Sequence, residues 1–80
     1  MVKKVCLVTG ATSGLGKCIS LKLFREGFKL ILVSKSKSKL DELRNIIGVN
    51  NIKYFCVDLS NLQETKRFLK KVSSIDILIN

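Results

Sequence analysis

The sequence predicts an α/β fold: a doubly wound, Rossmann-type parallel sheet, of which the chain supplies the N-terminal βαβαβαβ portion. Short apolar runs rich in β-branched residues alternate along the chain with helix-like patterns. A glycine-rich segment, Gly10-x-x-x-Gly14-x-Gly16, directly follows the first of these runs. Eighty residues allow at most one small domain, so residues 1–80 are expected to belong to a single domain, as its truncated N-terminal part.

Four apolar runs are the predicted strands. They are short and nearly continuous, which is typical of parallel strands covered by helices on both faces. The runs comprise residues 5–8, 30–33, 52–57 and 75–79.

Three helices are predicted between these strands, each with apolar residues repeating along one face. Gly27 and Gly48 are placed to end the first two helices, because glycine adopts the backbone that closes a helix at low cost. The predicted face of the first helix consists of Leu15, Cys18, Ile19 and Leu23. The face of the second consists of Leu40, Leu43 and Ile47.

The third helix is predicted to begin with a capping box, Ser60-x-x-Gln63. Its predicted apolar face consists of Leu62, Thr65, Leu69 and Val72, with Phe68 beside them. Right-handed crossovers between parallel strands give the doubly wound strand order 3-2-1-4. The fourth strand is therefore expected at an open edge.

The chain is strongly basic, with 15 Lys and Arg against 6 Asp and Glu and a net charge of +9. Such a charge would suit a nucleic acid or an anionic membrane. The basic residues are spread over several predicted elements, and few aromatic residues are present for stacking on bases. We expect a solvated basic surface and neither partner. The alternative is a basic nucleic-acid-binding domain, whose affinity would fall steeply with salt.

Cysteine usage and the first residues indicate a reducing compartment. Cys6, Cys18 and Cys56 are odd in number, lack C-x-x-C spacing and stand in apolar contexts, which predicts buried, reduced thiols. The basic start is followed by too few apolar residues for a signal peptide or a membrane span. A cytoplasmic location is expected. Without histidine, imidazole acid/base chemistry and imidazole metal ligands are excluded.

The glycine-rich segment predicts a phosphate cradle. Gly10 suits the tight turn, Gly14 the close approach of a pyrophosphate, and Gly16 the packing of the helix on the sheet. The helix that follows aims its free N–H groups at the same anion. The hydroxyls of Thr12 and Ser13 donate either to phosphate or to the loop's own carbonyls, where they would only stabilise the turn.

The end of the second strand predicts which dinucleotide binds. An acid there holds the ribose 2′-hydroxyl of NAD, and a basic residue accommodates the 2′-phosphate of NADP. Lys35 stands there between Ser34 and Ser36, with no acid nearby in the segment. We expect these three residues to bind the phosphate of NADP. The alternative is a solvated lysine in a loop.

These motifs together resemble the classical short-chain dehydrogenase/reductase family, over essentially the whole chain. The resemblance implies that Ser13 and Leu15 contact the cofactor, Leu15 through its backbone N–H. It implies that Asp58 accepts a hydrogen bond from the adenine amino group and that Leu59 supplies backbone and apolar contacts. Asp58 alternatively only helps to start the next helix. NADP-preferring members also carry a basic residue just before the second glycine, where this chain has Ser13.

The last five residues are similar to the start of the family's Asp-x-Leu-x-Asn-Asn-Ala-Gly segment, which makes Asn80 a cofactor contact. The family's catalytic serine, Tyr-x-x-x-Lys pair and further asparagine lie beyond that segment. Tyr54 is followed four positions later by Asp58, so it is not that tyrosine. The chain is expected to be truncated, with Asn-Ala-Gly encoded next and Tyr-x-x-x-Lys further on.

The resemblance implies an NADP-dependent oxidoreductase as the full-length protein. Hydride would pass between the nicotinamide and a small carbonyl or alcohol substrate. The full-length protein is expected to be a homo-oligomer. The alternative is a non-catalytic NADP-binding protein or a degenerate member of the family.

Overall fold

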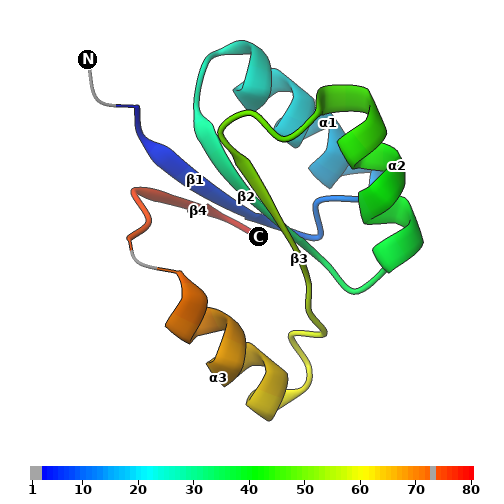
Figure 1. Cartoon of the computed structure of the whole chain (residues 1–80), viewed down its shortest axis with the longest axis vertical. Coiled ribbons are helices and arrows are strands. Elements are labelled where there is room, and N and C mark those ends of the chain that lie inside the picture. The colour runs from blue at the N-terminus through cyan, green and yellow to red at the C-terminus, as the bar shows by residue number, and fades with distance from the viewer. Residues whose placement is uncertain (1–2, 73) are drawn as a thin grey trace.

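The four apolar runs form one parallel sheet in the order β3-β2-β1-β4, which confirms the predicted topology (Figure 1). The computed structural model describes residues 3–72 and 74–80. The elements along the chain are β1 (Val5–Thr9), α1 (Gly14–Arg25), β2 (Lys29–Ser34), α2 (Lys37–Ile47), β3 (Ile52–Cys56), α3 (Leu62–Lys71) and β4 (Ile77–Ile79).

The sheet has a helical layer on each face. Figure 1 shows α1 and α2 on one side of the strands and α3 on the other. Alternate residues of β1 enter different clusters, because successive side chains of a strand point to opposite faces. Cys6 and Val8 pack with Leu43 of α2, and Leu7 packs with Phe68 of α3. The core is thus divided between the two faces of the sheet.

Burial differs between the central and the outer strands. β2 is buried from Leu30 to Ser34, as expected for a strand covered on both faces. In β3 only Ile52 is buried and the other residues are partly buried or exposed, and in β4 no residue is buried, which corrects the prediction for these two strands. The reason is that β3 and β4 are the outer strands of the described sheet. β4 pairs with β1 alone among the described residues.

The predicted apolar face of α1 is wrong at its N-terminal half. Leu15 is 74% exposed and Cys18 is exposed, whereas Gly16 and Ser20 are the buried residues of the helix. Ser20 is accommodated there because its hydroxyl donates to the carbonyl of Gly16 at 2.8 Å. Small side chains face the sheet, so this end of the helix approaches it closely. The predicted stop at Gly27 is confirmed, with a φ of 87°.

The start of α3 also corrects the prediction. Asn61, not Ser60, is the N-cap, and its side-chain oxygen accepts from the N–H of Glu64 at 3.1 Å. Ser60 is occupied elsewhere, because its N–H and hydroxyl both donate to Asp58. The N-cap is therefore shifted by one residue.

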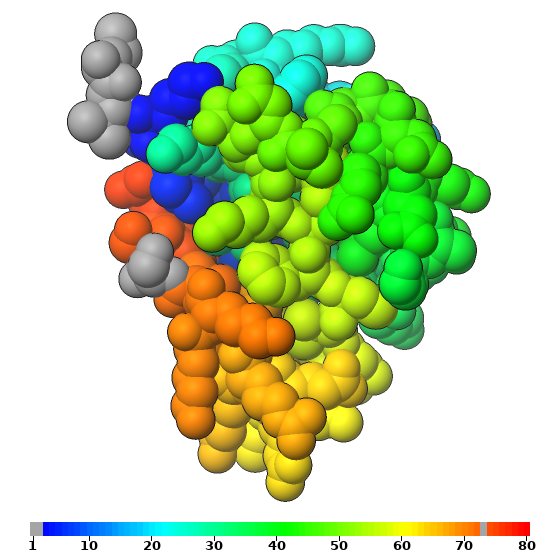
Figure 2. Space-filling view, in the orientation of Figure 1, coloured from blue at the N-terminus to red at the C-terminus, as the bar shows by residue number. Residues whose placement is uncertain are grey.

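The buried residue of α3 is Phe68, whose ring packs edge-on against Phe55 with centroids 5.0 Å apart. Leu62 and Leu69, predicted on the apolar face, are 67% and 55% exposed. Figure 2 shows α3 and the turn before it projecting from one end of the molecule. The aromatic side chain reaches the sheet from this position, and the two leucines stay in solvent.

Of the three free cysteines, only Cys6 is buried, and burial raises the pKa of its thiol. The prediction of burial is wrong for Cys18, on the outer side of α1, and for Cys56, at the end of an outer strand. In the described part of the chain, no helix is long and apolar enough to cross a membrane.

Candidate cofactor-binding site

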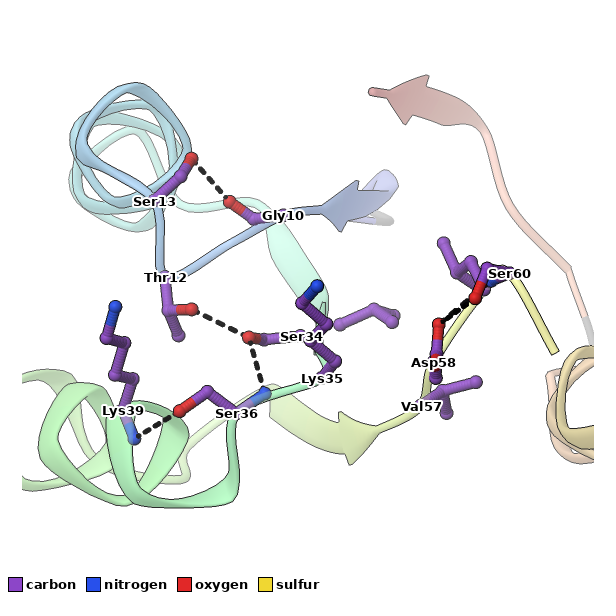
Figure 3. A pocket seen from close by; sticks show the side chains of 12 residues that line it. Gly10, Thr12, Ser13, Ser34, Lys35, Ser36, Lys39, Val57, Asp58 and Ser60 are labelled. Atoms are coloured by element: carbon purple, nitrogen blue, oxygen red, sulfur yellow. Dashed lines mark hydrogen bonds between the residues drawn. The ribbon is translucent and has the colours of Figure 1, made fainter.

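The carboxyl ends of β1, β2 and β3 border a cavity of about 400 Å³, within the size range of ligand pockets in proteins. Figure 3 shows the loops after these three strands converging on it. Its lining is formed by Gly10, Thr12, Ser13, Val33, Ser34, Lys35, Ser36, Lys39, Val57, Asp58, Leu59 and Ser60. Eight of the predicted site residues are thus brought together from three separate segments.

The turn after β1 is built on Gly10 and Ser13. Gly10 has a φ of 61°, a backbone conformation that favours glycine. Ser13 donates its hydroxyl proton to the carbonyl of Gly10 at 2.8 Å and accepts from the N–H of Gly16 at 3.1 Å. Ser13 therefore caps α1, which confirms the turn-stabilising alternative for its hydroxyl. Its contact with a cofactor stays a prediction.

Gly16 and Gly14 have different steric surroundings. A Cβ on Gly16 would stand 1.9 Å from the carbonyl oxygen of Gly10, so only glycine fits between the helix and the turn. A Cβ on Gly14 would meet no atom within 4 Å. The fold explains Gly16 but does not require glycine at position 14. The open space beside Gly14 fits a ligand that approaches the first turn of α1.

A pair of hydroxyls joins this turn to the end of β2. Thr12 Oγ1 lies 2.6 Å from Ser34 Oγ, and Ser34 Oγ also accepts from the N–H of Ser36 at 3.1 Å. Ser34 is only 7% exposed. Its hydroxyl thus holds two loops of the cavity together, and little of it is left to face a ligand.

The lysines of the cavity lie on the segment that follows β2. Lys35 comes directly after the strand, and Lys39 lies in the first turn of α2. Lys39 was not among the predicted site residues. Its position four residues after Lys35 is the only signal in the sequence that places it near the same edge.

Asp58 is the acidic residue of the cavity. Its Oδ1 accepts from the N–H of Ser60 at 3.0 Å and from the Ser60 hydroxyl at 2.6 Å. These hydrogen bonds, and next the positive charge of Lys35, hold the pKa of Asp58 below its ordinary value. The carboxylate is therefore an acceptor at neutral pH. It also organises the turn before α3, as the alternative interpretation of Asp58 states.

A second hollow of about 180 Å³ adjoins the first and shares Gly10 and Ser13 with it. Leu15, Gly16 and Asn80 line this hollow, and Asn80 Oδ1 accepts from the hydroxyl of Thr9 at 2.8 Å. All predicted site residues except Gly14 therefore line one of the two adjoining hollows.

The residues present fit a dinucleotide. A positive-φ turn and the first turn of a helix face the space where an anion would lie. Lys35 and Lys39 line the cavity after β2, where the sequence predicts that the adenine ribose of a dinucleotide would lie. The described residues contain no group of His, Cys, Asp and Glu side chains that would hold a metal ion. The class of protein defined by this fold and site is a Rossmann-type dinucleotide-binding protein.

A family model described as short chain dehydrogenase matches residues 4–80, and the chain belongs to that family. These proteins are oxidoreductases that use nicotinamide cofactors. The resemblance to the short-chain dehydrogenase/reductase family, predicted from the sequence, is confirmed.

Two curated relatives and one solved structure illustrate the similarity. An uncharacterised oxidoreductase of Staphylococcus aureus (strain USA300) is 33% identical over 84 residues, covering 100% of this chain and 36% of that protein. An NADP-dependent 3-hydroxy acid dehydrogenase of Escherichia coli O6:H1 is 34% identical over 80 residues, covering 95% and 32%.

The solved structure is a closed form of serine dehydrogenase complexed with NADP+. It superposes with a TM-score of 0.83 at 32% identity, covering 92% of this chain and 31% of that one. The chain thus spans about a third of the length of the relatives it matches.

Proposed function

We propose that these 80 residues are the NADP-binding, N-terminal part of a short-chain oxidoreductase that transfers hydride between the nicotinamide and a carbonyl or alcohol carbon. The observation that carries the choice of NADP is Lys35, which follows β2 directly and lines one cavity with the glycine-rich turn. A carboxylate at this place would repel a 2′-phosphate, and the segment after β2 has none before Asp41. The NADP named for two similar proteins supports the same choice.

In this proposal the residues of the chain bind and orient the cofactor. The N–H groups of Gly14 and Leu15, at the start of α1, have no intrahelical acceptors and face the pyrophosphate, whereas the N–H of Gly16 donates to Ser13. Asp58 accepts from the adenine amino group, and Lys35 neutralises the ribose phosphate. Leu59 and Val57 give the adenine ring an apolar wall. The bound cofactor supplies the hydride chemistry.

The catalytic side chains of the proposed enzyme lie outside these residues. Tyr54, the sole tyrosine, donates its hydroxyl to the carbonyl of Gly48 at 2.6 Å and is not among the residues that line the two hollows. The proposal therefore assigns the acid/base residues to a further segment of a longer protein. The coverage of about a third of each relative supports this assignment.

Calorimetric titration of the chain with NADPH and with NADH tests the proposal. We expect NADPH to bind roughly 10- to 100-fold more tightly, since a charge-assisted contact contributes about 1.5–3 kcal/mol. Adding arbitrary double-stranded DNA serves as the control for a general affinity of the basic surface. Equal binding of both nucleotides, or binding of neither, would contradict the choice of NADP.

A further inference from the structure

Lys39 lines the same cavity as Lys35, although no motif in the sequence distinguishes it. Figure 3 shows the two lysines on either side of Ser34, with Lys39 extending toward Thr12. A smaller hollow is lined by both Thr12 and Lys39, which places these two residues together a second time. We propose that Lys39 is a second phosphate-binding residue that shares with Lys35 the recognition of the 2′-phosphate of NADP. This inference rests on the function proposed above.

The neighbouring charges leave Lys39 available for a ligand. Among residues 3–72 and 74–80, the ion pairs join Lys22 to Glu26 and Lys37 to Asp41. Lys37 stands in the same helical turn as Lys39, but its ammonium lies 3.3 Å from Asp41 and it is not part of the cavity lining. Glu42 lines the smaller hollow beside Lys39 without forming an ion pair in this set.

The uncharged polar side chains at this edge are already engaged. The Ser34 hydroxyl bonds with Thr12 and with the N–H of Ser36. The positive charge of Lys35 also helps to lower the pKa of Asp58. A phosphate monoester carries a charge of about −1.5 to −2 at neutral pH, so one shared lysine leaves it incompletely neutralised. Lys39 supplies the second positive charge.

The position of Lys39 is unfavourable for the helix itself. The N-terminal end of a helix carries a partial positive charge, which favours acidic residues in the first turn. α2 has no acidic residue there, and Lys37 and Lys39 both lie at that end. A bound phosphate would convert this repulsion into attraction. A charge that opposes local stability and lines a cavity is expected where binding requires it.

Calorimetry with two adenosine nucleotides tests Lys39 directly. The full chain is titrated with adenosine 2′,5′-bisphosphate and with adenosine 5′-monophosphate, which differ only in the 2′-phosphate. We expect Lys39→Gln to lower the ratio of the two affinities about five- to tenfold and Lys39→Arg to preserve it. Lys37→Gln removes the same charge from the same turn, and the ratio should stay within about twofold of wild type. Because both nucleotides bind the same folded state, the ratio does not depend on the stability of a variant.

The possible outcomes distinguish failure of the inference about Lys39 from failure of the proposed choice of NADP. If Lys35→Gln lowers the ratio and Lys39→Gln does not, the inference about Lys39 is wrong and the choice of NADP stands. An equal loss in Lys37→Gln and Lys39→Gln would reveal a general charge effect, which also overturns the inference. If the wild-type chain binds the two nucleotides equally, both proposals fail.

Discussion

At the scale of single residues, Gly14 and Gly16 belong to one motif but have separate physical roles. Gly16 is required by the fold, because its Cβ would overlap the carbonyl of Gly10. Gly14 starts α1 in open space, so the protein itself would accept a side chain there. Glycine lowers helix stability relative to alanine, and we propose that position 14 is glycine because a ligand comes close.

Alanine substitutions separate these roles. We expect Gly14→Ala to raise the free energy of unfolding by about 0.5–1 kcal/mol and to weaken NADPH binding. Gly16→Ala should destabilise the chain, since backbone must move to admit the methyl group. Urea denaturation and calorimetry measure the two effects. Unchanged NADPH affinity in Gly14→Ala would show that no phosphate group approaches this residue.

Lys35 is the residue on which the choice of cofactor depends. Lys35→Asp replaces an attraction for the 2′-phosphate with a repulsion and adds an acceptor for the ribose 2′-hydroxyl of NAD. We expect the substitution to invert the preference, so that NADH binds more tightly than NADPH. Titration of both nucleotides against the wild type and the variant measures the change. A ratio unaltered by the substitution would make Lys35 a solvated surface lysine.

At the scale of elements, the start of α3 assigns different tasks to two adjacent residues. Asn61 caps the helix, and Ser60 donates two hydrogen bonds to Asp58. Asn61→Ala should therefore lower the free energy of unfolding by about 1 kcal/mol, measured by urea denaturation. Ser60→Ala keeps the cap and serves as the matched variant. An equal loss in both variants would contradict this assignment.

The turn before α3 also predicts that the free energy of unfolding depends on pH. The Ser60 hydrogen bonds, followed by Lys35, lower the pKa of Asp58 below its ordinary 3.8 in the folded chain. A depressed carboxyl pKa stabilises the fold above pH 3.8, and this contribution is lost as the pH falls through the folded-state pKa. We expect Ser60→Ala to raise the pKa of Asp58, as followed by NMR titration of its carboxyl carbon. No change in that pKa would show that the Ser60 hydroxyl does not donate to Asp58 in solution.

At the scale of the whole molecule, β4 leaves an edge without a partner in the described sheet. Leu78 of this strand is 58% exposed, and unpaired apolar edges promote association between chains. We expect the 80-residue chain to associate as its concentration rises, as measured by sedimentation. Leu78→Lys should shift it toward monomer, whereas Leu62→Lys, on the exposed side of α3, should not. A wild-type monomer at all concentrations, with a cooperative melt, would contradict the expectation.

The proposal divides the protein into these 80 residues, which bind the cofactor, and a further segment, which carries the catalytic side chains. The 80 residues should bind NADPH but should not oxidise it in the presence of small aldehydes and ketones, followed by absorbance at the nicotinamide band. A chain extended through a Tyr-x-x-x-Lys segment is the matched control. Turnover by the 80 residues alone would place catalytic groups among the residues described here and overturn that division.

The sequence by itself determined the alternation of strands and helices, the strand order and the family. The elements and the family follow from short-range patterns, because the apolar runs, the glycine spacing and Gly27 each act within a few residues of the chain. The strand order follows from the right-handed crossovers of the doubly wound topology. The predicted binding residues also came together, since parallel strands bring their carboxyl ends to one edge. Their binding of NADP stays a prediction.

Only the tertiary structure decided which side of each helix is buried and which polar group bonds to which. Leu15 is exposed and Ser20 buried because the close packing of α1 depends on Gly16 meeting Gly10, a contact between helix and turn that periodicity does not encode. Likewise, Ser34 and Thr12 are distant in sequence, and their hydroxyls meet only after β1 and β2 pair. Lys39 likewise lines the cavity only because the elements pack together. Its place in the lining follows from how α2 packs against the sheet, which is set by contacts between elements and not by local pattern.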